Sequence, residues 1–170
     1  DMKPPVFITS MRSGSFAGTG NCGGRRRAAG AGLIGHANMT ELAYSGLGLN
    51  PHYGTPLTSL REGCIAGGST SGGASAVARG VADIALGTDT GGSARIPAAF
   101  CGLYGVKPTA SSISRAGAVP LSHSLDSVGV MTRDIGLLRP VLNVLRDTPL
   151  PAAPMPASID GHHASNPTSS

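Results

Sequence analysis

The stretch that decides the fold spans residues 67–109 and reads GGSTSGGASAVARGVADIALGTDTGGSARIPAAFCGLYGVKPT. Two Gly-Gly-Ser corners within it end at Ser69 and Ser93, 24 positions apart. Between the corners, the small side chains of residues 71–79 predict a helix that a glycine ends, and the apolar residues 81–86 predict a buried strand. This spacing suggests that both corners lie at one end of a sheet, so we expect the two serine hydroxyls to act together.

The segment upstream of these corners predicts one strand, one helix start and a long loop. The apolar residues 33–35 have the length of a short strand. Asn38, with Glu41 three residues later, matches a capping box and predicts the start of a helix. Residues 46–66 are interrupted by Gly and Pro and predict a loop, whereas residues 1–31 carry no clear pattern.

The segment downstream predicts a strand at residues 102–106 and a helix over residues 132–147. Pro140 lies within the helix pattern and should kink or break it, because proline has no backbone N–H. The C-terminal residues are rich in Pro, Ala and Ser without any period. We therefore expect one partial domain of the α/β class over residues 1–147 and a disordered tail over residues 148–170.

Composition argues against several classes of function. The net charge is +4, and its one local cluster, Arg25–Arg27, has no accompanying nucleic-acid motif, so we expect no nucleic-acid partner. The three cysteines lack the spacing of a metal site or a disulfide framework, and we expect no metal and no cofactor. The sequence has no signal peptide and no apolar run long enough to cross a bilayer, which predicts a cytoplasmic protein without a membrane partner.

The two serines need a base before they can react. A serine hydroxyl becomes a good nucleophile only when a neighbouring group takes its proton. Neither corner lies in a Gly-x-Ser-x-Gly elbow or a Ser-x-x-Lys motif, and no histidine stands in a recognisable motif. Neither Gly-rich turn ends in Gly-Lys-Ser or Gly-Lys-Thr, which excludes a P-loop. The residues by themselves leave the identity of the base open.

Residues 67–109 resemble the signature region of the amidase signature family, whose members hydrolyse amide bonds with a Ser–cis-Ser–Lys triad. The similarity extends upstream over residues 33–56 and downstream over residues 114–133. The resemblance implies a layered α/β/α core with a mixed sheet, of which this chain carries an incomplete part. It also implies a small-molecule amide as the substrate and a reaction without a cofactor.

The resemblance assigns roles to individual residues. Ser93, in the run GTDTGGS, matches the nucleophile. Ser69 matches the bridging serine, and the family holds the peptide bond before that serine in the cis form. The backbone N–H groups of Thr90, Gly91 and Gly92, together with that of Ser93, suit an oxyanion hole at the substrate.

The base is harder to assign, because the chain contains only two lysines. Lys107 matches a family lysine that is not the base. Lys3 lies 66 residues before Ser69, near the distance at which the family carries its catalytic lysine. The base is therefore either Lys3 or a lysine that this chain lacks. Asp89 and Arg95 flank the nucleophile, and we expect them to form a structural ion pair.

Three functions stay open at this point. The first is an amidase that acts through Ser93, Ser69 and a lysine. The second is a truncated, inactive remnant that binds a partner or associates with itself through an uncovered sheet face. The third is an A-type component of an amidotransferase, which in the same family supplies ammonia to partner subunits for a transfer-RNA-linked reaction.

Overall fold

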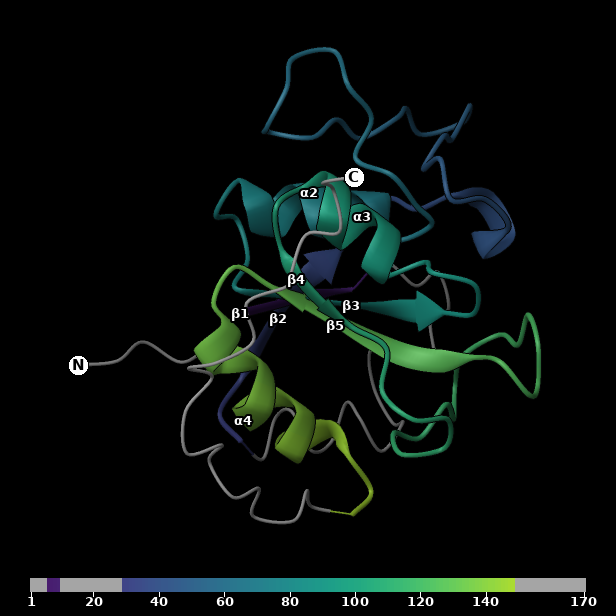
Figure 1. Ribbon diagram of the computed structural model, residues 1–170, viewed down its shortest axis with the longest axis vertical. Coiled ribbons are helices and arrows are strands. Elements are labelled where there is room, and N and C mark those ends of the chain that lie inside the picture. The colour runs from purple at the N-terminus through teal and green to yellow at the C-terminus, as the bar shows by residue number, and fades with distance from the viewer. Residues whose placement is uncertain (1–5, 10–28, 149–170) are drawn as a thin grey trace, which may run out of the picture.

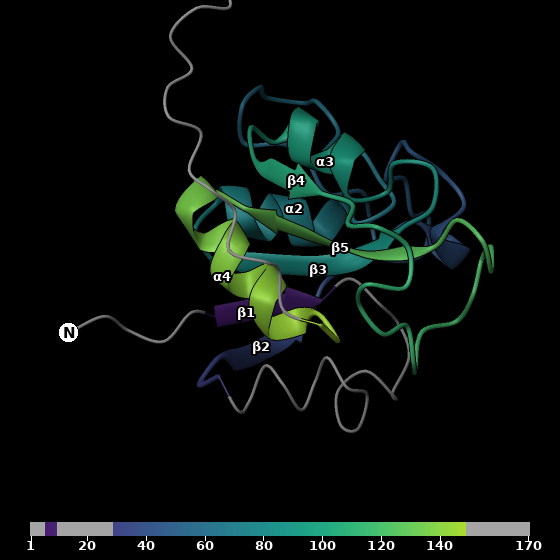
Figure 2. The same ribbon diagram turned by 60° about the horizontal axis from the view of Figure 1, so that its bottom comes forward.

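The sheet at the centre of the molecule is mixed. The structure, a computed structural model, describes residues 6–9 and 29–148 of the chain. The sheet (Figure 1) consists of β1 (Val6–Thr9), β2 (Gly32–His36), β3 (Ile84–Asp89), β4 (Tyr104–Val106) and β5 (Ser127–Thr132). Its strands lie in the order β2-β1-β3-β5-β4, which runs from bottom to top in Figure 2. β1 pairs in parallel with β2 and β3, whereas β5 pairs antiparallel with β3 and β4. The mixed sheet that the resemblance implies is therefore confirmed.

Helices cover both faces of this sheet. α2 (Ser71–Ala78) and α3 (Arg95–Phe100) lie on one face, and α4 (Ile135–Leu145) lies on the other (Figures 1 and 2). A 3₁₀ turn, η1 (Glu41–Ala43), lies in the long loop that precedes α2. This arrangement is the expected α/β/α layering. No helix among the described residues has the length and apolar character that crossing a membrane requires.

Two clusters of buried side chains hold the layers together. Successive residues of a strand point to opposite faces, so Ile84 and Leu86 of β3 pack toward α4 while Ala85 packs toward α2 and α3. The α4 cluster consists of large aliphatic side chains, which include Leu138 and Val141. The opposite cluster is built mainly from alanines that lie in α2, α3 and β3 or in the segments beside them. Large aliphatic side chains therefore hold α4 against the sheet, whereas small side chains let α2 and α3 pack close to it.

Glycines in the strands make that close approach possible. A Cβ atom added to Gly129 of β5 would lie 2.5 Å from the Cβ of Ala94, and one added to Gly105 of β4 would lie 2.5 Å from the Cβ of Ala98. Because these separations are far below van der Waals contact, α3 can lie this close to the sheet only where the strands carry glycine.

Most of the predicted elements are confirmed, with shifted ends. The strand at residues 33–35, the helix at 71–79, the strand at 102–106 and the helix at 132–147 correspond to β2, α2, β4 and α4. The strand expected at residues 81–86 begins three residues later, because the chain first turns after α2 and leaves Val81 62% exposed. β1, β5 and α3 were not predicted.

One local prediction is wrong, and the break expected at Pro140 is absent. Asn38 does not cap a helix, since its amide Nδ2 instead donates to the carbonyl of Gly54 at 2.6 Å and its Oδ1 accepts from the N–H of Met39. Pro140 does not break α4, which runs without interruption from Ile135 to Leu145. Proline removes only one helical hydrogen bond there, and the apolar face of α4 is held against the sheet on both sides of it.

Candidate active site

The two Gly-Gly-Ser corners lie against each other beyond the carboxyl end of β3. The backbone N–H of Thr70, directly after the first corner, donates to the carbonyl oxygen of Ser93 in the second corner at 3.1 Å. Ser69 is fully buried, whereas Ser93 is half-buried. β3 ends at Asp89, and four residues later the chain reaches Ser93 immediately before α3. The expected meeting of the corners is therefore present in the backbone.

The first corner is fixed by the loop that contains η1. The peptide bond between Gly68 and Ser69 is cis, as the resemblance implies. The N–H of Gly68 donates to the carbonyl of Gly46 at 2.7 Å, and the carbonyl of Ser69 accepts from the N–H of Thr40 at 3.0 Å. A Cβ on Gly68 would lie 2.5 Å from the backbone nitrogen of Gly48, so the loop and the corner meet backbone to backbone.

Three consecutive hydroxyls at this corner are buried without a hydrogen-bond partner among the described residues. They belong to Ser69, Thr70 and Ser71, which are 0%, 1% and 0% exposed. Neither Thr70 nor Ser71 caps α2, although both residue types commonly do. Buried hydroxyls cost about 1–3 kcal/mol when they lack a partner, so a cluster of them marks a place where a polar group is expected to bind.

Asp89 anchors the far end of the nucleophile turn, residues 90–93. Its fully buried carboxylate accepts hydrogen bonds from the N–H groups of Ala94 at 3.1 Å and Arg95 at 3.2 Å. It also accepts from the Arg95 side chain, through Nε at 3.1 Å and Nη2 at 3.0 Å. Burial alone would raise the pKa of Asp89, but these donors and the Arg95 charge hold it below its usual value. The expected ion pair is confirmed.

Lys107, the residue directly after β4, holds the same turn. Its ammonium group donates to the backbone carbonyls of Asp89, Thr90 and Leu125, and it lies 3.7 Å from the Asp89 carboxylate. An ammonium group has three N–H donors, and here they are directed at carbonyl oxygens. This geometry suits a structural cation and agrees with the expectation that Lys107 is not the base.

The nucleophile turn presents free backbone donors. The N–H groups of Gly91, Gly92 and Ser93 make no hydrogen bond to any described residue. Gly92 has φ +136°, a conformation that favours glycine, and a Cβ there would lie 2.8 Å from the Ile96 side chain. Free N–H groups in a fixed turn beside a serine are the arrangement that stabilises an oxyanion.

Asp126, which no sequence pattern singled out, anchors the near end of the turn. Its carboxylate is 3% exposed and accepts from the Thr90 hydroxyl at 2.5 Å. The other oxygen accepts from the N–H groups of Leu121 at 2.8 Å and Ser122 at 3.0 Å. Burial alone would raise the pKa of Asp126, but these three donors, with a smaller contribution from the charge of Arg115, hold it below its usual value.

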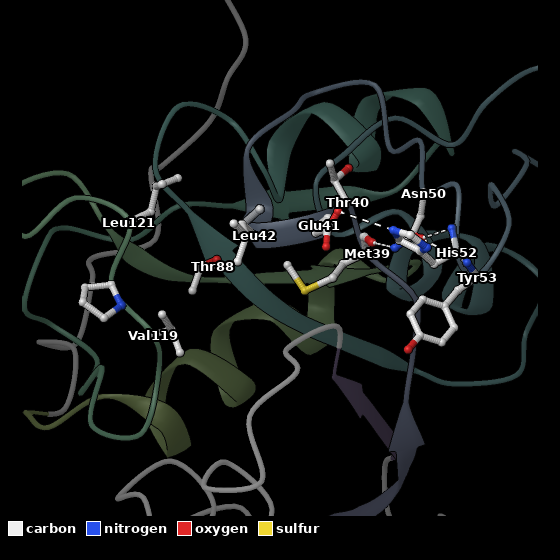
Figure 3. A pocket seen from close by; sticks show the side chains of 12 residues that line it. Met39, Thr40, Glu41, Leu42, Asn50, His52, Tyr53, Thr88, Val119 and Leu121 are labelled. Carbon is white, nitrogen blue, oxygen red and sulfur yellow. Dashed lines mark hydrogen bonds and ion pairs between the residues drawn. The ribbon is translucent and has the colours of Figure 1, made fainter.

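A cleft of about 660 Å³ lies beside the corners (Figure 3). Its walls come from the η1 loop, the turn at residues 50–53 and the segment 119–121, with Thr88 of β3 between them. A smaller cavity of about 190 Å³ shares Thr88 with it and reaches Arg115 and Asp126. Neither Ser69 nor Ser93 lines the cleft, and Thr40, whose N–H binds the Ser69 carbonyl, connects it to the first corner.

The remaining predicted site residue, Lys3, lies outside the described residues. Among the residues that the structure does describe, no group of three or more His, Cys, Asp or Glu side chains could hold a metal ion.

Comparison with known proteins gives a consistent result. The family model described as Amidase matches residues 24–163. The chain is 50% identical over 110 residues to an indoleacetamide hydrolase of Pseudomonas savastanoi, a match that covers 65% of this chain and 24% of that protein. It is 44% identical over 117 residues to the A component of the glutamyl-tRNA(Gln) amidotransferase of Methanospirillum hungatei, covering 69% of this chain and 27% of that protein.

A solved structure described as an amidase has the same architecture. It superposes with a TM-score of 0.78 at 35% sequence identity, over 86% of this chain and 37% of that one. The chain therefore spans about a quarter of the length of the curated relatives named above.

Proposed function

The chain belongs to the amidase family, and from that premise we propose that it hydrolyses a carbon–nitrogen amide bond through an acyl-enzyme on Ser93. The observation that carries the proposal is the junction of the two corners, where the Thr70 N–H binds the Ser93 carbonyl beside free turn N–H groups. A half-buried serine next to a buried one, in a turn whose N–H groups bind no described residue, is suited to acyl transfer.

In the proposed reaction, the Ser93 oxygen attacks the amide carbonyl carbon while its proton passes to the Ser69 oxygen. The proton of the Ser69 hydroxyl passes in turn to a neutral lysine amine. The backbone N–H groups of Gly91, Gly92 and Ser93, with that of Thr90, bind the negatively charged oxygen of the tetrahedral intermediate. The C–N bond then breaks as the relay returns a proton to the leaving amine. Water attacks the remaining ester and releases the acid and free Ser93.

For the base we propose Lys3. The buried hydroxyls of Ser69 and Ser71 lack partners among the described residues, and an amine placed between them would receive and donate the hydrogen bonds that they need. Removal of such an amine from water lowers its pKa, because burial disfavours the ammonium form, and a neutral amine is what the relay requires. A lysine in a longer form of the protein would serve the same chemistry.

The amidotransferase reaction is the second candidate, because a relative of that kind is 44% identical over 117 residues. That reaction would use the same serines. Its amide substrate would be glutamine, and it would need partner subunits. The third possibility, an inactive remnant, has no observation of its own that favours it over these two.

The experiment that tests the proposal measures ammonia release by the purified chain from an uncharged primary amide such as indole-3-acetamide and, separately, from glutamine. We expect the wild-type chain to release ammonia from a primary amide and the Ser93→Ala variant to release none. Release from glutamine only after a partner protein is added would favour the amidotransferase. Equal rates for wild type and Ser93→Ala would refute both.

A further inference from the structure

Asp126 joins two segments that are far apart in the sequence. One carboxylate oxygen takes the Thr90 hydroxyl of the nucleophile turn, and the other takes the N–H groups of Leu121 and Ser122. Residues 119–121 form one wall of the 660 Å³ cleft. We propose that Asp126 is a positioning residue, which couples the wall of the cleft to the backbone donors around Ser93. The coupling would act on the acyl transfer proposed above and rests on that function.

The first half of this connection fixes where the turn begins. Thr90 is the first residue after β3, and the next three residues carry the free N–H groups. The bond from its hydroxyl to Asp126 is 2.5 Å long and ends on a carboxylate, the strong class of hydrogen bond. A rotation about the Thr90 backbone would redirect the N–H groups that follow, so this bond limits where they point.

The second half fixes the cleft wall. The two N–H groups of Leu121 and Ser122 converge on a single carboxylate oxygen, at 2.8 Å and 3.0 Å. Val119 and Leu121 face the cleft beside Thr88 (Figure 3). A ligand that presses on this wall would therefore act on the same carboxylate that holds the Thr90 hydroxyl.

Asp126 is itself well fixed. Arg115 donates from Nη1 to the carbonyl oxygens of Asp126 at 3.3 Å and His123 at 2.9 Å. The next residue, Ser127, is the first of β5 and pairs with Asp89 at the end of β3. The carboxylate is thus held at the strand ends from which the turn departs, and its lowered pKa keeps it ionised at neutral pH.

The test uses the full chain, four single variants and the double variant of Thr90→Val with Asp126→Asn. Thr90→Val removes the hydroxyl at nearly constant shape, Thr90→Ser keeps it, and Asp126→Asn alters the acceptor. Thr109→Val is the matched control, since Thr109 is an exposed threonine outside the site. Two quantities are measured: the rate of Ser93 acylation by a small fluorophosphonate, resolved into kinact and KI, and hydrogen exchange of the backbone in peptides that cover residues 90–93 and 119–122.

The coupling predicts a specific pattern. Thr90→Val and Asp126→Asn should each lower kinact by about tenfold, with KI nearly unchanged, because the misplaced N–H donors act on the charge that develops during acylation. The double variant should be no slower than the slower single one. Exchange of residues 119–122 should accelerate in Thr90→Val, although that substitution lies in the other segment. Thr90→Ser keeps the hydroxyl and should recover most of the kinact that Thr90→Val loses, and Thr109→Val should behave like wild type.

The proposal is overturned if Thr90→Val leaves exchange of residues 119–122 unchanged, or if Thr90→Ser is as slow as Thr90→Val. Failure of the proposed function looks different, because wild type would then not react with the probe at all. In that case the exchange data alone still decide whether the two segments are linked through Asp126.

Discussion

Two buried carboxylates hold the nucleophile turn, and they do so in different ways. Asp89 faces two cations, Arg95 at 3.0 Å and Lys107 at 3.7 Å, and binds the N–H groups at the end of the turn. Asp126 is held mainly by neutral donors, the Thr90 hydroxyl and two backbone N–H groups. The turn is therefore anchored by charge where α3 begins and by neutral hydrogen bonds where β3 ends.

The difference indicates which anchor serves stability and which serves the site. Removing the charge of the fully buried Asp89 leaves its N–H donors, together with the partly exposed Arg95 and Lys107, without a matching acceptor, which is costly. Removing a carboxylate from neutral donors leaves only unsatisfied hydrogen bonds. We therefore expect changes at Asp89 to act first on folding and changes at Asp126 to act first on the geometry around Ser93.

The largest effect is expected for Asp89→Asn. This change leaves Arg95 and Lys107 beside a neutral amide that cannot accept from all of the present donors. It should lower the free energy of unfolding by about 2–4 kcal/mol, less than for a fully buried pair because the Arg95 side chain is 49% exposed. Urea unfolding followed by circular dichroism measures the change. Asp83→Asn is the control, because Asp83 forms an exposed pair with Arg133 at 3.8 Å and should lose less than about 1 kcal/mol.

A smaller loss is expected for Lys107→Met. The methionine fills the space of the lysine stem but cannot bind the carbonyls of Asp89, Thr90 and Leu125. Loss of these charge-assisted bonds should lower the free energy of unfolding by about 1.5–3 kcal/mol, again measured in urea. Arg139→Met on the exposed side of α4 should be neutral. A neutral Lys107→Met would mean that Arg95 alone compensates Asp89.

Of the substitutions at Asp89, Lys107 and Asp126, Asp126→Asn should lower the free energy of unfolding the least. We expect a loss of about 1–2 kcal/mol, since one oxygen remains as an acceptor and no cation is left unpaired at close range. Urea unfolding followed by circular dichroism again measures the change. If Asp126→Asn destabilised the chain as much as Asp89→Asn, the contrast between a charged and a neutral anchor would be wrong.

Protonation in acid should weaken the hydrogen bonds of both the Asp89 and the Asp126 carboxylates. The folded-state pKa values of Asp89 and Asp126 lie below the usual aspartate value, so the folded chain binds fewer protons than the unfolded chain in acid. Their stabilisation is complete above the unfolded pKa of about 3.9 and is lost as the pH falls through the lower folded values. Thermal melts between neutral pH and pH 2 should show Tm falling below about pH 4. A steeper fall in Asp89→Asn than in wild type would contradict the assignment.

The same contrast explains what the sequence could predict. The partners of Asp89 at Ala94 and Arg95 lie five and six residues away, within one motif, so the ion pair could be expected from the sequence. The Thr90 partner of Asp126 lies 36 residues away, and only the pairing of β3 with β5 brings them together. Nothing in the spacing of those two residues indicates the bond.

The missed elements have related causes. β5 is buried at all six positions, so it lacks the alternation that identifies a half-exposed strand. β1 is four residues long and stands in a segment without a clear pattern. The capping pattern at Asn38 and Glu41 was overridden because the Asn38 side chain binds the carbonyl of Gly54 in the neighbouring turn.

The central claim is that Ser93 is an activated nucleophile, and the most direct measurement is covalent labelling. The purified chain and Ser93→Ala are incubated with a fluorophosphonate, and the adduct is mapped by mass spectrometry. We predict a single adduct on Ser93 in the wild-type chain and none in Ser93→Ala. A chain that melts cooperatively and carries no adduct, or one on another serine, would contradict the account.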